Sequence, residues 1–230
     1  MTALHTLTLV ALAATAALGQ SPARPPIVYA QDVTGRCKQL LDTLPQPPAE
    51  PSGTFKPDCD SAAYYFGIGR PVDYAAARQC AYVERAHSDA NNPDIFAGPG
   101  VLSMIYANGH GVKPDLELAK RFTCEGWAAP AELEGRLDIL DNDRKTNTVA
   151  KFDLCETATS GFSEGWCANI DSRLNQVRRA KNIKLIVDKL PASALPAFHA
   201  LQSAENDFDD LRSGNEVDLS GTGRAAFESM

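Results

Sequence analysis

The sequence contains two copies of one pattern, YYFGIGRPVDYAAAR at residues 64–78 and YANGHGVKPDLELAK at residues 106–120. Tyrosine, glycine, aspartate, alanine and a basic residue recur in step, and Asp73 lies 42 residues before Asp115. An offset of this size is typical of repeats that consist of a pair of helices. The repeat therefore predicts a stack of helical hairpins.

Within each copy, glycine and aspartate mark where one helix ends and the next begins. Gly67 and Gly109 follow the first segment, where a helix commonly ends on a left-handed residue. Asp73 and Asp115 precede the second segment, where a side-chain oxygen can cap the first backbone amides of a helix. Each copy thus predicts a helix, a tight turn and a second helix.

This pattern resembles the Sel1-like repeat, a bacterial relative of the tetratricopeptide repeat, over residues 59–130. That unit reads approximately A-x-x-x-L-G-x-x-Y-x-x-G-x-G-V-x-x-D-x-x-x-A-x-x-W. The second copy matches it at Leu102, Tyr106, Gly109, Gly111, Val112, Asp115, Ala119 and Trp127. The first copy departs from it at Ile68 and Arg70-Pro71. The resemblance implies a helical scaffold for protein binding. Such stacks usually need about three units, so the Cys37 region or the following domain should cap this one.

A second signature begins at Lys151. Cys155 and Cys167 belong to the pattern C-x11-C-x3-D-x2-L-N, and AENDFDDLR follows at residues 204–212. Together these resemble the N-terminal domain of the lysozyme-inhibitor LprI-like family, over residues 151–230. Phe208 stands where that family often has Trp. The resemblance implies a small helical domain of an exported protein.

Hydrophobic spacing also predicts helices in this region. Apolar residues recur at intervals of three and four from Ile170 to Leu190 and again from Leu195 to Leu211, with Pro191 between the two runs. We therefore expect an antiparallel hairpin and a third helix near Thr222. That helix reaches Met230 without a stop signal, so the sequence leaves open whether the natural chain continues beyond Met230. The predicted fold is all-α: Sel1-like hairpins followed by a disulfide-bonded LprI-like domain.

The N-terminal region predicts export. Residues 1–19 contain an uncharged apolar run and end in small residues, as a signal peptide does. Residues 20–58 read as a proline-rich leader that contains a short helix over 32–44. We expect no membrane span in the mature chain and a periplasmic or secreted location.

The six cysteines predict disulfides, because an even number of cysteines in an exported chain usually forms a disulfide framework. Metal sites favour C-x-x-C pairs or clustered histidines, and neither is present. Spacing favours Cys155 with Cys167 and Cys59 with Cys80, which would leave Cys37 with Cys124, among 15 possible connectivities.

The charge of the chain favours a protein partner. A formal net charge of −7 argues against nucleic acid and favours a basic partner, such as a lysozyme. Candidate binding residues are the acidic cluster Glu205, Asp207, Asp209 and Asp210. A groove of Tyr64, Tyr65, Tyr106 and Trp127 is a further candidate contact, but we favour the interpretation that these aromatics are core residues of the repeats.

Motifs of catalysis are weak in this sequence. Ser163 lies in G-x-S-x-G at residues 161–165, but no apolar strand precedes it, as a hydrolase nucleophile would need. G-x-G-x-x-A at residues 221–226 also lacks a strand, and His110 lies in a turn. We expect no enzyme and no cofactor. The leading hypothesis is an exported protein-interaction protein; a lysozyme inhibitor acting through residues 151–230 is the alternative, and a serine hydrolase is third.

Overall fold

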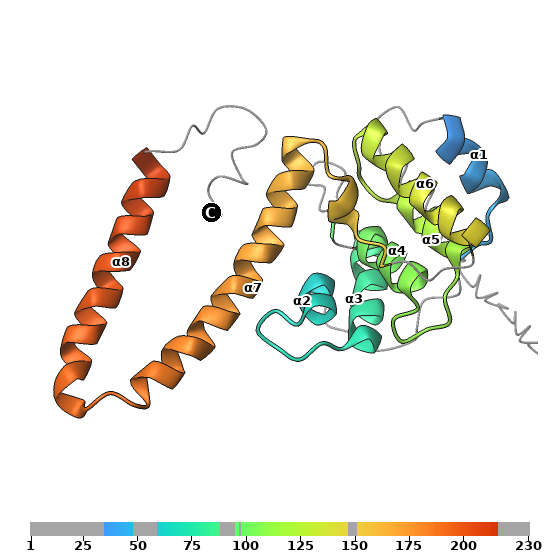
Figure 1. The fold of residues 1–230 in the computed structure, drawn as a ribbon. Coiled ribbons are helices and arrows are strands. Elements are labelled where there is room, and N and C mark those ends of the chain that lie inside the picture. The colour runs from blue at the N-terminus through green and yellow to red at the C-terminus, as the bar shows by residue number, and fades with distance from the viewer. Residues whose placement is uncertain (1–34, 48–58, 88–94, 97, 147–150, 216–230) are drawn as a thin grey trace, which may run out of the picture.

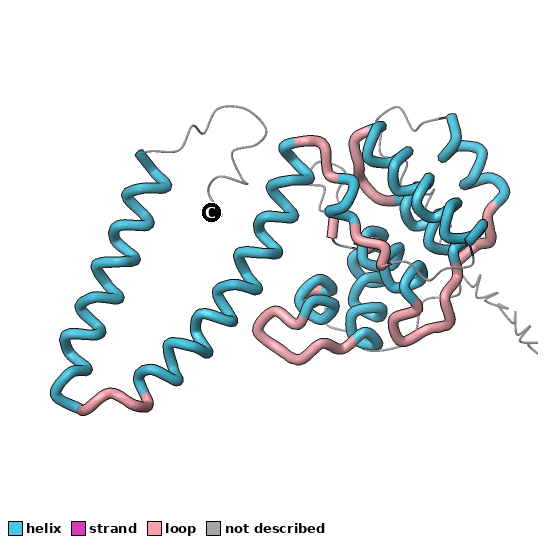
Figure 2. Tube along the Cα trace, viewed as in Figure 1, coloured by secondary structure: helices cyan, strands magenta, loops and turns pink. Residues whose placement is uncertain are grey.

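The computed structural model describes residues 35–47, 59–87, 95–96, 98–146 and 151–215. These residues form helices joined by loops, and none of them belongs to a strand (Figure 2). The prediction of an all-α, disulfide-bonded fold is confirmed. The expected signal peptide, most of the proline-rich leader and the helix expected near Thr222 lie outside the described residues. In chain order the elements are α1 (Gly35–Thr43), α2 (Ser61–Phe66), α3 (Tyr74–His87), α4 (Pro99–Asn108), α5 (Leu116–Glu125), α6 (Pro130–Thr146), η1 (Leu154–Thr157), α7 (Gly161–Val187), η2 (Ala192–Ala194) and α8 (Leu195–Asn215).

The two predicted hairpins are α2–α3 and α4–α5. Gly67 and Gly109 end the first helix of each with left-handed φ angles of 75° and 68°. The next helix begins at an aspartate in both copies: Asp73 Oδ1 accepts from the Ala76 amide at 2.9 Å, and Asp115 Oδ1 accepts from the Leu118 amide at 3.0 Å. The same hydrogen bonds recur at the offset read from the sequence, so the structural repeat is confirmed.

Helices α2 to α5 pack around one hydrophobic core, with α4 near its middle (Figure 1). Val101, Leu102 and Ile105 of α4 are fully buried. Ala77 and Ala119 occupy equivalent positions in the two copies and are also fully buried. A methyl group at these positions allows neighbouring helices to approach closely, which explains why alanine recurs there.

Helix α1 covers the α5–α6 end of the stack, although it precedes the repeats in the chain (Figure 1). Cys37 is fully buried and forms a disulfide with Cys124 of α5. The Arg36 guanidinium forms ion pairs with three carboxylates of α6, at 2.7–2.8 Å: Glu134, Asp138 and Asp141. The Cys37 helix therefore caps the stack. This is one of the two arrangements that the sequence predicted, the other being a cap formed by the following domain.

The segment that leads into α7 is also part of the repeat core. Asn108, at the end of α4, accepts from the Phe152 amide at 2.7 Å and donates to the Phe152 carbonyl at 2.8 Å. Phe152, Leu154 and Ile170 are buried in the same cluster as the repeats. The two regions identified by resemblance thus share one core.

Beyond Ile170, α7 leaves the body of the protein and runs to a turn around Pro191, after which α8 returns in the opposite direction (Figure 1). The predicted helical hairpin is confirmed. We call residues 171–215 the arm and the remaining described residues the body. No helix in the described ranges combines the length and the apolar character needed to cross a membrane.

Candidate binding surface

The three disulfides all lie in the body and at its junction with α7. They join Cys37 to Cys124, Cys59 to Cys80 and Cys155 to Cys167, which are the pairs that the spacing favoured. The arm contains no cysteine. Covalent cross-links therefore rigidify the body and the start of α7.

A carboxylate lies close to one of these disulfides. A Glu84 oxygen and the sulfurs of Cys59 and Cys80 lie within 4.8 Å of one another. The two sulfurs are bonded to each other, and Glu84 accepts hydrogen bonds from the Ser61 amide and hydroxyl and from the Gly98 amide, at 2.5–2.8 Å. These bonds tie α2, α3 and the start of α4 together, so the cluster is a structural clamp.

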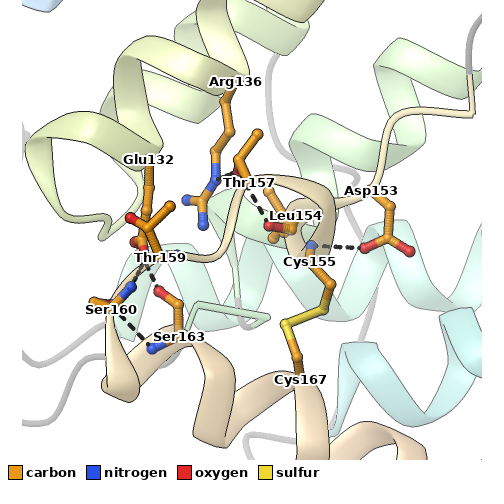
Figure 3. The surroundings of a disulfide bond; sticks show 10 residues. All are labelled: Glu132, Arg136, Asp153, Leu154, Cys155, Thr157, Thr159, Ser160, Ser163 and Cys167. Carbon is orange, nitrogen blue, oxygen red and sulfur yellow. Dashed lines mark hydrogen bonds between the residues drawn. A yellow bond between two sulfur atoms is a disulfide. The ribbon is translucent and has the colours of Figure 1, made fainter. Parts of the chain in front are cut away.

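Ser163, the candidate nucleophile, lies at the start of α7 beside the Cys155–Cys167 disulfide (Figure 3). It is fully buried, and its hydroxyl donates to Glu132 Oε2 at 2.7 Å. Its backbone amide donates to the Ser160 hydroxyl, which caps the helix. His199, the histidine downstream in the sequence, is exposed on α8 and contacts Gln202. This geometry supports a role for Ser163 in joining α6 to α7.

Glu132 is the centre of that junction and was missed by the sequence analysis. It is fully buried, and besides Ser163 it accepts the backbone amides of Ala129, Thr159 and Ser160 at 2.7–3.0 Å (Figure 3). Burial by itself would raise the pKa of Glu132, but these hydrogen bonds outweigh it and lower the pKa to about 2. The sequence feature that could have identified Glu132 is its position in the first turn of a helix that begins at Pro130, where a glutamate often accepts backbone amides.

Arg136 lies one helical turn beyond Glu132 and is also buried. Desolvation lowers the pKa of Arg136 to about 10, opposed by the nearby Glu132 charge. Its guanidinium donates to the Thr157 hydroxyl and the Trp127 carbonyl, both at 3.2 Å. The two charged residues thus anchor the segment that precedes α7.

The predicted aromatic groove does not form an open surface. Tyr65 and Tyr106 are buried, and the Tyr106 hydroxyl lies 3.1 Å from that of Tyr82. Tyr64 and Trp127 are half-buried, with Arg70 stacked over the Tyr64 ring and Phe162 against Trp127. These four side chains belong to or pack against the hydrophobic core. The favoured interpretation of them as core residues is confirmed, and the alternative of an aromatic binding groove is not.

His110 joins the two repeat turns. Its ring stacks on that of Tyr74 with centroids 4.2 Å apart, and burial lowers its pKa. A histidine in this setting is neutral at physiological pH and packs as an aromatic residue.

The predicted acidic residues Glu205, Asp207, Asp209 and Asp210 are all exposed on α8. Glu205 pairs with Arg179 of α7 at 2.6 Å, which links the two helices of the arm. The sequence analysis overlooked the opposite charge on α7. Between Arg173 and Val187 that helix carries five basic side chains and no acidic one.

The arm also exposes large apolar side chains. Val177, Leu185 and Ile186 of α7 are 41–54% exposed, and Leu201, Phe208 and Leu211 of α8 are 60–65% exposed. The hydrophobic spacing predicted these helices correctly, but their apolar residues do not bury one another. The arm therefore combines several exposed large apolar side chains with charged side chains of both signs.

Comparisons with known proteins place few limits on this surface. No family profile matches the chain, and no solved structure matches it. The vacuolar protein-sorting protein bro1 of Emericella nidulans is 27% identical over 152 residues, which is 59% of this chain. The chain spans about 15% of the length of that curated relative. A similarity of this extent does not assign the chain to a family.

Proposed function

We propose that this chain is an exported, non-enzymatic protein-interaction protein in which the disulfide-bonded body holds the arm and the arm binds another protein. The observation that carries this proposal is the exposed apolar surface of α7 and α8. Six large apolar side chains are 41–65% exposed on two helices that extend beyond the core. Monomeric proteins seldom expose apolar residues in such groups, except where a partner covers them.

The surroundings of these residues support the same function. Basic side chains on α7 and acidic side chains on α8 flank the apolar ones, as a polar rim surrounds the apolar centre of a protein interface. The body gives the arm a firm base through Ile170 and through the ion pair of Arg173 with Asp60 at 2.8 Å. On this view, Sel1-like hairpins act as the scaffold and the LprI-like region provides the contact.

Export is part of the proposal. Three disulfides are typical of an oxidising compartment, and the N-terminal segment has the composition of a signal peptide. Both features support a periplasmic or secreted location.

Photo-cross-linking tests the contact. With a photoreactive phenylalanine analogue at Phe208, we expect the chain in its native cells to form discrete cross-linked products of defined mass. Ser203 is exposed on the same helix but on another face, and the same analogue there should give much less product. Equal labelling at the two positions, or no product at either, would contradict the proposal.

A second candidate is a lysozyme inhibitor. Exposed Glu205, Asp207, Asp209 and Asp210 provide a carboxylate surface, and lysozymes are typically basic. The test uses the whole oxidised chain, because Phe152 and Ile170 are buried in the repeat core. An inhibitor should act stoichiometrically, lose strength as salt is raised, and lose it again in Asp207→Lys/Asp209→Lys. Undiminished lysozyme activity at excess protein and low salt would eliminate this candidate for the lysozyme used.

A further inference from the structure

A pocket of about 220 Å³ lies where α7 joins the body, between α2, α3 and α7. This volume is below that of pockets for drug-sized ligands and well above what one water molecule needs. Four apolar side chains form part of its lining: Ala62, Phe96, Trp166 and Ile170. The pocket therefore suits a small organic group with an apolar part.

Three charged side chains line the same pocket: Asp60, Glu84 and Arg173. Arg173 pairs with Asp60 at 2.8 Å, so these two charges offset each other. The donors to Glu84 are neutral groups of Ser61 and Gly98, and no basic side chain in the described part of the chain forms an ion pair with it. Burial raises the pKa of Glu84 despite these hydrogen bonds, and the Asp60 charge raises it further. The pocket thus carries one uncompensated negative charge in a desolvated position.

The hydrogen bonds of Glu84 select the kind of cation that fits. A carboxylate has about four acceptor sites, two on each oxygen. Glu84 Oε2 accepts from the Ser61 hydroxyl and the Gly98 amide, whereas Oε1 accepts only from the Ser61 amide. One acceptor site therefore remains, on Oε1. A guanidinium binds a carboxylate best through both oxygens, whereas a compact ammonium group can donate to one.

We propose that this pocket binds a primary alkylammonium group. The ammonium donates to Glu84 Oε1 and offsets its charge, and the alkyl chain lies against Phe96, Trp166 and Ile170. An indole ring among these walls also attracts a cation. Such a group ends a lysine side chain and occurs in free aliphatic amines. The site goes beyond the proposed function, because it lies at the junction of body and arm and does not depend on what covers the exposed apolar residues of the arm.

Titration of the oxidised full chain with n-butylamine, which reproduces the lysine side chain, tests the site. We expect saturable shifts of the NMR signals of the Trp166 indole and of the Ser61 and Gly98 amides, with a dissociation constant of about 1 mM for so small a ligand. n-Butanol has a similar size but no charge, and it should bind about tenfold more weakly. Equal binding of the alcohol, or no saturable shift with the amine, would overturn the site.

Two substitutions change the charge of the pocket in opposite directions. Glu84→Gln removes the uncompensated charge and should weaken n-butylamine binding about tenfold or more. Arg173→Gln removes the positive charge and leaves Asp60 unpaired, so it should strengthen binding by about threefold. Asp171→Asn is the matched control, because Asp171 is exposed on α7 and does not line the pocket. Its affinity for the amine should equal that of wild type.

The outcomes with these variants decide the inference. A folded Glu84→Gln chain that binds the amine as wild type does would refute it. If Glu84→Gln does not fold, Arg173→Gln decides, since an unchanged or lower affinity in that variant contradicts the charge argument. Nα-acetyl-lysine methylamide then separates the two sources of the ammonium group. If it binds as n-butylamine does, the pocket accepts a lysine of a partner protein, and if only n-butylamine binds, the site is one for free amines. Both results support ammonium binding, whether or not position 208 cross-links to a protein.

Discussion

Replacement of Glu132 by alanine is expected to lower the free energy of unfolding by about 3–5 kcal/mol. Glu132 is fully buried and accepts three backbone amides and the Ser163 hydroxyl. Without the carboxylate these donors lose their partner in a site with little access to water, and the buried Arg136 loses the nearby negative charge. Urea unfolding of the disulfide-intact protein measures the loss.

Glu164→Ala is the control for that measurement. Glu164 lies in the same turn of α7 as Ser163 but is exposed, so its removal should change stability by less than about 1 kcal/mol. If the two variants unfold at the same urea concentration, Glu132 does not hold α6 to α7 as described here.

The same carboxylate predicts a pH dependence. The pKa of Glu132 is lowered from 4.5 to about 2 in the folded protein. Its stabilising contribution, roughly 3 kcal/mol, is therefore complete above the unfolded pKa and is lost as the pH falls from about 4.5 through 2. Glu132→Gln has no group to titrate, so the stability difference between it and wild type should shrink over this range. A constant difference from pH 6 to pH 2 would contradict the assignment.

Removal of the Cys37–Cys124 disulfide is the second change with a large expected effect. These cysteines are 87 residues apart, and on the chain-entropy model the cross-link stabilises by about 4–5 kcal/mol. Cys37→Ala/Cys124→Ala should therefore lower the free energy of unfolding by that amount. It should also release α1, because a helix of 9 residues is unstable by itself. Hydrogen exchange should show early loss of protection in α1.

Cys155→Ala/Cys167→Ala provides the comparison. These residues are only 12 apart in sequence, so the loss should be smaller, about 3 kcal/mol, and α1 should keep its protection. The role assigned to the Cys37–Cys124 bond would be wrong if α1 amides were equally protected in both double variants.

Local patterns predicted the repeat helices and the arm of this fold, but not α6 (Pro130–Thr146). Gly67 and Gly109 end helices and Asp73 and Asp115 begin them, because left-handed backbone and side-chain capping depend on residues within one turn. Pro191 separates α7 from α8 for an equally local reason. Residues that join distant segments were not predicted. Asn108 has no special local signature, and the first-turn position of Glu132 does not reveal its distant partners; both matter because the fold brings Phe152 and Ser163 to them.

The aromatic residues and the arm also show that the sequence does not predict contacts between distant segments. The sequence pattern placed Tyr65 and Tyr106 in the helical repeats and Leu201 and Phe208 in a helical stripe, but it does not determine what covers each side chain. The tertiary structure buries the tyrosines in the repeat core and leaves the arm residues exposed. By itself, the sequence determined the repeat helices, the helices of the arm, their turns and a set of cysteines suited to pairing, all of which depend on neighbours in the chain or on simple spacing. Only the tertiary structure decided which apolar faces are covered, because burial depends on contacts between segments far apart in sequence.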